Sequence, residues 1–431
     1  MKYSIITFGC RVNQADSLRM EEEFRSRGGR ASAPADADVV VVNTCSVTAT
    51  ADQGARQTIR RLARDNPALR LVVTGCYATR CEADVAELPN VVQVVRNHEK
   101  DGLVARVMDG DGPCGAPIEP GVAGRTAFTL RVQTGCEAHC AYCIIPSTRG
   151  PGRSLPVEQV VAEVQRVAHA GFKEIALTGV HLGSYGRDLP SHPTFTDLMQ
   201  SLLELKGPPP DLVFRISSLE PMDCPMDLVA LVSSSGGRIA PHFHLPLQHA
   251  NDHMLTAMRR PYTLAYYRRL VDRIQERLPH ASIGSDMIVG FPGESDEHFT
   301  SNLDYLPSSP LTHLHVFPYS DRPGTEATAM REKVDARIVR ERGATLRRIG
   351  AELTRRFHAG QAGTTRPALT LEDGTLVVTD NYLKVRIPPG LARNQRVNVR
   401  ITEAAGSLSG VVEPSRTEPV ELPRTEPCRT W

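Results

Sequence analysis

The hydrophobic positions of the first hundred residues fall into short runs, and polar stretches with helical patterning separate them. The apolar runs cover residues 3–9, 38–44 and 69–75. Helix-compatible segments follow near residues 13–27 and 49–64. Apolar runs that do not alternate with polar residues, and that helices separate, are typical of strands buried on both faces of a parallel sheet. We therefore expect an open parallel α/β domain over residues 1–108.

A second series of strand-like runs begins after residue 127. Its members are residues 128–134, 174–180, 212–218, 242–248, 282–290 and 313–319. Helix-compatible stretches separate these runs, for example residues 156–171. Six strand–helix units over residues 127–362 predict a partial or full β/α barrel. In such a barrel, the active site lies at the C-terminal ends of the strands.

The remaining segments have other patterns. Residues 109–126 are rich in Gly and Pro, which predicts a linker. Residues 363–413 hold short β-type runs consistent with a small β-barrel, and the Pro-rich residues 414–431 predict a disordered tail. The helical segment 326–360 is rich in arginine, so a solvated face and an RNA-backbone contact are equally open. The expected fold class is α/β with a small C-terminal β-barrel.

Composition limits the class of protein. The amino terminus turns polar after one strand-length apolar run, so we do not expect a signal peptide. No apolar stretch approaches the roughly 20 residues that span a bilayer, so we expect a cytoplasmic protein without membrane contact. In a reducing cytosol, the ten cysteines are expected to bind metal or to do chemistry. The net charge of +1 provides no global attraction for nucleic acid.

Three cysteines follow the three apolar runs of the first domain. Cys10, Cys45 and Cys76 each stand directly after a strand-like run. The carboxyl ends of the strands form the ligand-binding edge of an open α/β sheet, so these side chains should meet there. The alternative is three small buried residues, because free cysteine is common in protein cores. Three cysteines at equivalent positions favour a shared ligand role.

Three more cysteines lie within nine residues, in the stretch GCEAHCAYC. Cys136, Cys140 and Cys143 follow the first strand of the expected barrel, so they belong to its active-site rim. A disulfide with a spare thiol, a zinc site that uses His139 as a fourth ligand, and an iron–sulfur cluster are all open. A 4Fe–4S cluster with three cysteine ligands would leave one iron free for a small molecule.

The spacing of these three cysteines resembles the signature of radical S-adenosylmethionine (SAM) enzymes. The motif is CxxxCxxC with an aromatic residue before the last cysteine, and Tyr142 occupies that position. The resemblance implies a 4Fe–4S cluster on Cys136, Cys140 and Cys143. Its open iron would bind the amino and carboxyl groups of SAM, and an electron would cleave SAM to a 5′-deoxyadenosyl radical.

The rest of the chain is similar to the methylthiotransferases within that superfamily. Agreeing stretches are residues 143–154, 177–189, 215–221, 244–263, 286–294 and 315–325. The resemblance implies a second 4Fe–4S cluster on Cys10, Cys45 and Cys76. One SAM molecule would methylate sulfur held there, and a second would supply the radical.

Two stretches resemble one branch of this family. NTCSVTATAD around Cys45 and HVFPYSDRPGT at residues 315–325 are similar to the branch that modifies threonylcarbamoyladenosine at position 37 of tRNA. The implied reaction replaces the hydrogen on carbon 2 of the adenine with a methylthio group. The alternatives are a methylthiotransferase for isopentenyladenosine in tRNA or for ribosomal protein S12, and a non-enzymatic iron–sulfur or RNA-binding protein.

The resemblance also implies partners and further site residues. The partners are the anticodon stem–loop of tRNA and an electron donor such as a flavodoxin or ferredoxin, and we expect a monomer. No catalytic residue is expected beyond the cluster ligands. The candidate cofactor contacts are Tyr142, Gly179, Gly290, Asp286 and Glu294. Tyr142 is almost equally suited to a packing role, and a glycine that follows a strand is equally often only a turn requirement.

The remaining histidines and cysteines are assigned no ligand role. His242 and His244 alternate along one expected strand, and His313 and His315 along another, so each pair shares a face. We expect them in the barrel interior or at its rim, and not as metal ligands. The expected bystanders are Cys81, Cys114, Cys224 and Cys428.

Overall fold

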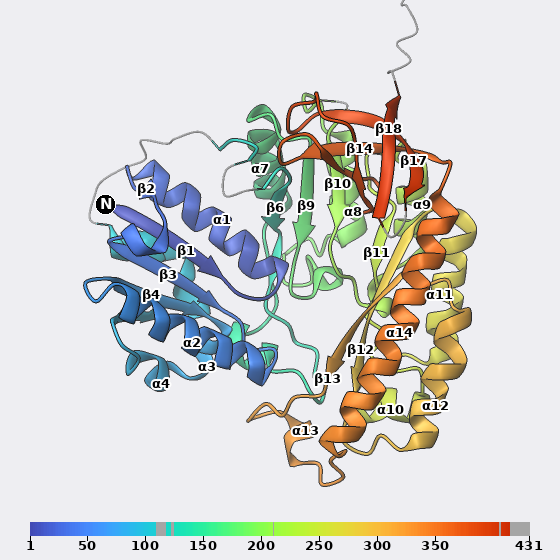
Figure 1. Cartoon of the computed structure of the whole chain (residues 1–431), viewed down its shortest axis with the longest axis horizontal. Coiled ribbons are helices and arrows are strands. Elements are labelled where there is room, and N and C mark those ends of the chain that lie inside the picture. The colour runs from blue at the N-terminus through green and yellow to red at the C-terminus, as the bar shows by residue number, and fades with distance from the viewer. Residues whose placement is uncertain (109–117, 122–124, 210, 405–406, 414–431) are drawn as a thin grey trace, which may run out of the picture.

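The computed structural model describes residues 1–108, 118–121, 125–209, 211–404 and 407–413. Figure 1 shows a parallel sheet with flanking helices, a larger parallel α/β unit, and a small β-barrel at the carboxyl end. The expected α/β fold class is confirmed. Among the described residues, each helix is too short or too polar to span a bilayer.

The first domain is a five-stranded parallel sheet in the order β2-β1-β3-β4-β5. The strands are β1 Lys2–Thr7, β2 Arg30–Ala31, β3 Val39–Thr44, β4 Arg70–Gly75 and β5 Val91–Val95. Every residue of β3 is buried, which explains its unbroken apolar run. Helix α1 (Arg11–Ser26) packs Met20 and Phe24 on one face of the sheet. Helix α2 (Ala49–Asp65) packs Ile59 on the other face.

The register of this sheet brings its carboxyl ends together. Thr7 of β1 pairs with Asn43 of β3, and Thr44 of β3 pairs with Gly75 of β4. The loops that follow these three strands therefore leave one edge of the sheet. Shorter helices after the strands are α3 (Cys76–Arg80), α4 (Glu82–Ala86) and α5 (Leu103–Val107).

The central unit contains two three-stranded parallel sheets. Their strands are β6 Phe128–Arg131, β9 Glu174–Thr178, β10 Val213–Ile216, β11 His242–His244, β12 Ser282–Val289 and β13 His313–Pro318. Parallel bridges between Phe214 and Ile239, and between Ser218 and His244, connect β10 to the segment that contains β11. The six expected strands are present, and within the described residues β6 and β13 do not pair with each other. The barrel is therefore partial and laterally open.

Helices cover the outside of this partial barrel, where their apolar faces join its core. The helices are α7 Val157–His169, α8 Phe195–Glu204, α9 Met226–Ser234, α11 Leu264–Arg277, α12 Asp296–Tyr305 and α14 Ala336–Gln361. Short elements at the rim are β7 Gln133–Thr134, β8 Arg153–Ser154, α6 Ile145–Arg149 and α10 Asp252–Ala257.

The arginine-rich segment differs from the expected single helical stretch. It contains α13 (Glu326–Ala329) and then α14 (Ala336–Gln361), with a break between them. Asp335 lies at the start of α14, where its side chain accepts a hydrogen bond from the backbone N–H of Arg337. A side-chain acceptor at this position satisfies a free helix N–H group, so a new helix begins here.

The carboxyl-terminal strands form a closed barrel in the order β14-β15-β16-β18-β17. Its strands are β14 Thr365–Leu371, β15 Leu376–Thr379, β16 Lys384–Arg386, β17 Arg396–Ala404 and β18 Ser407–Glu413. The barrel has its own apolar core, which includes Val377, Val385 and Val399. The expected tail, residues 414–431 with Cys428, lies outside the described residues.

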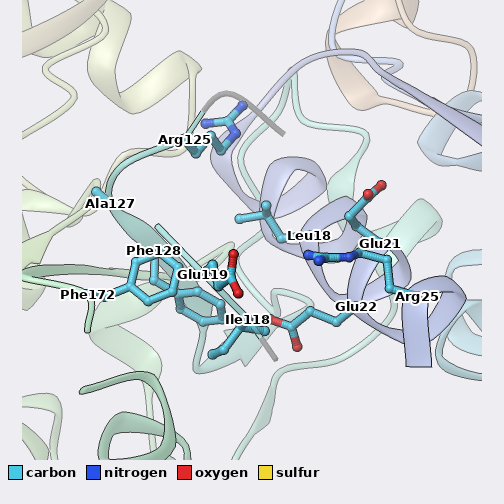
Figure 2. Close-up of a pocket in the computed structure, with 10 residues that line it drawn as sticks. All are labelled: Leu18, Glu21, Glu22, Arg25, Ile118, Glu119, Arg125, Ala127, Phe128 and Phe172. Carbon is cyan, nitrogen blue, oxygen red and sulfur yellow. The ribbon is translucent and has the colours of Figure 1, made fainter. Parts of the chain in front are cut away.

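The described part of the expected linker packs against both neighbouring domains. Ile118 is only 8% exposed and belongs to the core of the partial barrel. Figure 2 shows Ile118 with Phe128 and Glu22 at a small cavity of about 30 Å³. The Arg125 guanidinium donates a hydrogen bond to Gln14 Oε1 at 3.2 Å. Residues 109–117, which include Cys114, and residues 122–124 lie outside the described part.

Candidate active site

The first cysteine triad, Cys10, Cys45 and Cys76, lies at the carboxyl edge of the amino-terminal sheet. Cys10 precedes α1, Cys45 follows β3, and Cys76 is the first residue of α3. Gly9 has a φ of 87°, and a Cβ there would lie 2.5 Å from Cys45 Cβ, so only glycine permits this approach. Burial, together with the nearby Cys10 and Cys76, raises the pKa of the Cys45 thiol to about 11. The three cysteines therefore lie near one another at the carboxyl edge of this sheet.

The second triad, Cys136, Cys140 and Cys143, lies on the loop between β7 and α6. Backbone hydrogen bonds fix this loop: Cys143 N–H donates to the Cys140 carbonyl, and Cys136 N–H donates to the Gly150 carbonyl, both at 3.0 Å. Burial raises the pKa of Cys143 to about 12, and Cys140 and Cys136 act in the same direction. The three cysteines therefore lie on one short loop at the rim of the partial barrel.

A buried arginine contacts the second triad. Arg260 is 5% exposed, and its Nη1 donates to Cys140 Sγ at 3.3 Å. The guanidinium also pairs with Glu220 and donates to the Tyr262 hydroxyl. Hydrogen bonds and positive charge stabilise ligand thiolates. Arg260 lies in a stretch that resembles the family, but no local pattern indicated its contact with a cysteine.

A histidine lies beside another cysteine of the same triad. Nδ1 of His181 is 3.6 Å from Cys136 Sγ, and its Nε2 is 2.6 Å from an Asp223 carboxylate oxygen. Burial favours the neutral ring, but the hydrogen bonds to Asp223 and Cys136 outweigh burial and raise the pKa of His181 to about 9. Asp223 also pairs with Arg187 at 2.6 Å. Sequence reasoning missed His181, which is 45 positions from Cys136.

A second arginine joins the two domains behind the first triad. Arg149, on α6, is 6% exposed and donates to Asn13 Oδ1 of α1. Burial opposes its charge, but Cys76 and Asp16 outweigh burial and raise its pKa. Asp16 also pairs with the fully buried Lys100 at 3.0 Å. This polar network holds the domain of the first triad against the loop of the second.

Two cavities adjoin the cysteine triads. The larger has a volume of about 830 Å³, and it is lined by Cys10 and Cys45, by the β9 end at Gly179, and by Tyr382 of the carboxyl-terminal barrel. The smaller, of about 180 Å³, is lined by Cys143, Tyr142, Gln248 and Ile288, among others. The residues that line both cavities are Val47, Thr48, Asp286 and Phe317. The cavities are therefore adjacent, and each touches one triad.

The four histidines of β11 and β13 line the larger cavity. Asp286 Oδ1 lies 3.1 Å from His244 Nε2 and 3.2 Å from His315 Nδ1. These three ligand atoms lie within 4.8 Å of one another. Burial disfavours the Asp286 charge, but the two imidazoles outweigh it and lower the pKa of that carboxyl. The same carboxylate oxygen serves both rings, which is the arrangement of an ion-paired hydrogen-bond network.

Family comparisons agree with this two-part site. Residues 2–96 match the model described as uncharacterized protein family UPF0004, and residues 130–306 match the radical SAM superfamily. The match to residues 2–96 covers the first cysteine triad, and the superfamily match covers the second.

Comparison with individual proteins shows to which family the chain belongs. The chain is 35% identical to threonylcarbamoyladenosine tRNA methylthiotransferase MtaB of Aquifex aeolicus, over 90% of this chain and 96% of the relative. It is 33% identical to the Bacillus subtilis protein of the same name, over 88% of each. The chain belongs to the radical SAM methylthiotransferase family. It is also 34% identical to tRNA-2-methylthio-N(6)-dimethylallyladenosine synthase of Herpetosiphon aurantiacus, over 81% of each chain.

Solved structures support the fold of this methylthiotransferase. The radical SAM methyltransferase TsrM from Kitasatospora setae, with cobalamin and a 4Fe–4S cluster bound, aligns with a TM-score of 0.54. The alignment covers 76% of each chain at 15% identity, so the likeness concerns the fold alone. The protein is a transferase of the radical SAM superfamily, and membership implies a 4Fe–4S cluster and SAM.

The second triad of this methylthiotransferase fits a 4Fe–4S cluster by its donor set. Cys136, Cys140 and Cys143 provide three thiol groups, and no fourth cysteine belongs to this loop. Arg260 and the Ala138 backbone N–H donate to these sulfur atoms at 3.3 Å each. Three sulfur donors and a neighbouring cation suit an anionic cluster with one iron open to a small ligand.

The candidate cofactor contacts occupy different positions. Tyr142 and Asp286 line the smaller cavity, and Gly179 and Asp286 line the larger. Gly290 and Glu294 line neither of these two cavities. Gly290 has a φ of 76°, and a Cβ there would lie 2.3 Å from Val339 of α14, so packing also requires glycine.

Glu294 is fully buried behind the end of β12. Its carboxylate accepts from the Gly290 backbone N–H at 2.6 Å and pairs with Arg342 at 2.8 Å. His249 Nε2 lies 3.1 Å from the other carboxylate oxygen. Other groups of the protein therefore bind both carboxylate oxygens of Glu294, and Glu294 stabilises the turn at Gly290. Cys224 is buried in the barrel core, and Cys81 packs beside the amino-terminal core.

Proposed function

We propose that this methylthiotransferase acts on tRNA and converts N6-threonylcarbamoyladenosine at position 37 to its 2-methylthio derivative. The observation that carries the proposal is the cavity of about 830 Å³ that joins Cys10 and Cys45 to the strand ends of the partial barrel. A substrate base in this cavity would contact both domains. The names of the Aquifex and Bacillus relatives support the threonylcarbamoyl substrate.

Each cysteine triad would hold one 4Fe–4S cluster. When bound, the cluster on Cys136, Cys140 and Cys143 supplies the electron that cleaves SAM, and the cluster on the first triad supplies the sulfur that is methylated and transferred. The sulfur donors of the first triad are Cys10, Cys45 and Cys76. Tyr142 and Asp286 line the smaller cavity next to the second triad, and Gly179 lines the adjacent larger cavity, so these three are the proposed SAM contacts. Gly290 and Glu294 act on the same space indirectly, through the end of β12.

The chain's own residues position these groups. Arg260 holds Cys140 by a hydrogen bond, and Arg149 fixes the loop of the second triad to the domain of the first. Buried positioning residues of this kind limit the motion of the ligands between catalytic steps. The proposed partners are the anticodon stem–loop of tRNA and a flavodoxin or ferredoxin, and the proposed state is a monomer.

Nucleoside mass spectrometry tests the substrate. Reconstituted protein with SAM and a reductant should convert a stem–loop carrying threonylcarbamoyladenosine to the methylthio product. A stem–loop carrying dimethylallyladenosine should remain largely unconverted. Conversion of the dimethylallyl substrate alone would overturn the assignment.

Selective loss of iron tests the two-cluster proposal. Replacing Cys136, Cys140 and Cys143 by alanine should abolish 5′-deoxyadenosine formation and remove about half of the reconstituted iron. Replacing Cys10, Cys45 and Cys76 should remove the other half, abolish methylthio transfer and leave 5′-deoxyadenosine formation. The matched control replaces Cys81 and Cys224, and full iron content is expected. A full iron content after loss of the first triad would contradict the second cluster.

A further inference from the structure

Arg11 is a cationic side chain in the larger cavity, and within the described part of the chain it has no acidic partner. It is half-buried and lines the cavity next to Cys10. Its Nη2 donates to the Tyr382 hydroxyl at 2.7 Å, and its guanidinium carbon lies 5.3 Å from the centre of that ring. Among the described residues, no carboxylate forms an ion pair with Arg11. A partly desolvated guanidinium without a carboxylate is a suitable binding group for an external anion.

The cavity lining has few groups that could neutralise Arg11. The acidic side chain in the described lining is Asp286, and it already pairs with His244 and His315. Burial lowers the pKa of His313 to about 4, so this ring is uncharged near neutral pH and does not repel the Arg11 guanidinium. Asp286 is therefore not paired with Arg11, and an anionic substrate group would meet an unpaired guanidinium.

Two buried polar atoms of the same lining provide independent support. His242 is 4% exposed and Ser217 is 5% exposed, and both line the cavity. His242 Nδ1 and Ser217 Oγ have no hydrogen-bond partner within the described structure. Buried polar atoms are normally satisfied, so unpartnered atoms at a cavity wall indicate a missing ligand or water. The His242 ring lies 4.6 Å from the Tyr382 ring, next to the group that binds Arg11.

Tyr382 is held in place by the carboxyl-terminal barrel. Its φ of 69° lies in the left-handed region, which is unusual for a residue with a bulky side chain. The Arg215 guanidinium stacks on its ring at 4.9 Å and donates to the carbonyl of Asp380 at 2.9 Å. The hydroxyl that orients Arg11 therefore comes from a different domain than Arg11 itself.

We propose that Arg11 binds the carboxylate of the amino-acid group on the substrate base, with Tyr382 as its positioning residue and with His242 and Ser217 as neighbouring hydrogen-bond partners. This inference rests on the proposed function, because the threonylcarbamoyl group carries a carboxylate whereas the dimethylallyl group has none. A site built for a charged group rejects an analogue without that group, because its own charge is then left unpaired. Arg11 would thus determine which modified adenosine is accepted.

The test compares three stem–loops with the reconstituted full-length protein. One carries threonylcarbamoyladenosine, the second carries its carboxamide analogue, and the third carries dimethylallyladenosine. We expect Arg11→Gln to lower kcat/KM for the carboxylate substrate by about 10- to 100-fold, the range for a lost hydrogen bond to a charged group. Its kcat/KM for the carboxamide should change less than threefold, so the preference for the carboxylate should collapse.

Controls separate this role from others. Arg19→Gln, on the exposed part of the same helix, should leave the preference unchanged. Because Arg11 neighbours Cys10, iron content and 5′-deoxyadenosine formation are measured for Arg11→Gln as well, and both should match the unmodified protein. An equal loss on the carboxylate and carboxamide substrates would indicate a contact with an RNA phosphate and would overturn the inference. An unchanged preference of Arg11→Gln for the carboxylate substrate would also overturn the inference.

A second variant keeps the inference testable if Arg11→Gln loses iron. Tyr382→Phe removes the hydroxyl that Arg11 binds and is far in sequence from the cysteine ligands. It should lower the preference for the carboxylate substrate severalfold with full iron content, and an unchanged preference would overturn the inference. Activity of the unmodified protein on the dimethylallyl substrate alone would overturn both the proposed function and this inference. Activity on the threonylcarbamoyl substrate with an unchanged preference in both variants would overturn the inference alone.

Discussion

Gly135 controls the path of the chain into the second cysteine triad. Its φ is 74°, and a Cβ at this position would lie 1.8 Å from the carbonyl oxygen of Pro151. The backbone cannot keep this path with any side chain present. We expect Gly135→Ala to reduce the iron bound at Cys136, Cys140 and Cys143, and to destabilise the fold by about 2–4 kcal/mol from strain and steric displacement.

Gly171→Ala is the matched control for this prediction. Gly171 has a φ of 90°, but nothing lies within 4 Å of the added Cβ. We expect only the conformational cost of roughly 1 kcal/mol and full iron content. Iron analysis and urea denaturation measure both effects. Equal behaviour of the two variants would show that the close contact with Pro151 is unimportant.

Arg260 is predicted to raise the reduction potential of a cluster bound at the second triad. It donates to Cys140 Sγ, and such hydrogen bonds favour the more negative, reduced form of a cluster. We expect Arg260→Met to lower the reduction potential of the reconstituted protein and to slow 5′-deoxyadenosine formation. Potentiometric titration followed by electron paramagnetic resonance measures the potential. The control is Arg259→Met, which removes only an exposed pair with Glu326, and a similar potential in both variants would refute this role.

At the scale of elements, strand β10 connects the partial barrel to the carboxyl-terminal barrel. Its Arg215 is 1% exposed and pairs with Glu174 of β9 through two hydrogen bonds of 2.9 Å. The same guanidinium donates to the carbonyl oxygens of Asp380 and Thr379 at the end of β15. One buried side chain thus joins three strands from two domains.

We expect Arg215→Met to destabilise the protein by about 3–5 kcal/mol, because the Glu174 charge is left buried without a partner. The carboxyl-terminal barrel should also become more sensitive to proteolysis near residue 362. Limited proteolysis and hydrogen exchange of β14–β16 provide the measurement. Arg355→Met, which removes an exposed pair with Glu352 on α14, should cost less than about 1 kcal/mol. Unchanged protection of the small barrel would contradict this anchoring role.

Local patterns predicted most elements, and they failed where a distant contact decided the outcome. The apolar runs located β1, β3 and β4, since a strand buried on both faces has few polar positions. Glu294 resembled a cofactor contact because it follows a strand of the barrel. In the structure, Arg342 of α14, 48 positions away, binds its carboxylate instead. No short-range pattern contains that pairing.

At the scale of the whole molecule, the histidine-lined cavity predicts loss of stability in acid. Burial lowers the pKa of His313 to about 4, with His244 and His315 acting in the same direction and Asp286 opposing them. The unfolded value is about 6.5, so the unfolded chain binds the proton more readily between pH 6.5 and 4. Stability is therefore full above pH 6.5, falls as the pH approaches 4, and loses up to about 3 kcal/mol from this residue.

Urea midpoints across this pH range test the prediction. His313→Gln should flatten the decline between pH 6.5 and 4 relative to the unmodified protein. The exposed His169 is the control, and His169→Gln should retain the full decline. A decline that is equally steep in His313→Gln would assign the acid sensitivity to other groups, such as the buried His242, whose pKa is also lowered.

The sequence alone determined what depends on neighbouring positions. The spacing of Cys136, Cys140 and Cys143 and the periodicity of the strands are short-range features, so they are visible without a fold. Only the tertiary structure decided that Arg149 lies beside the first triad and that Arg260 reaches Cys140. It also decided that Arg11 meets Tyr382, a residue 371 positions away. The physical reason is that these contacts arise from the packing of three domains, and no local pattern encodes which polar side chains share a cavity.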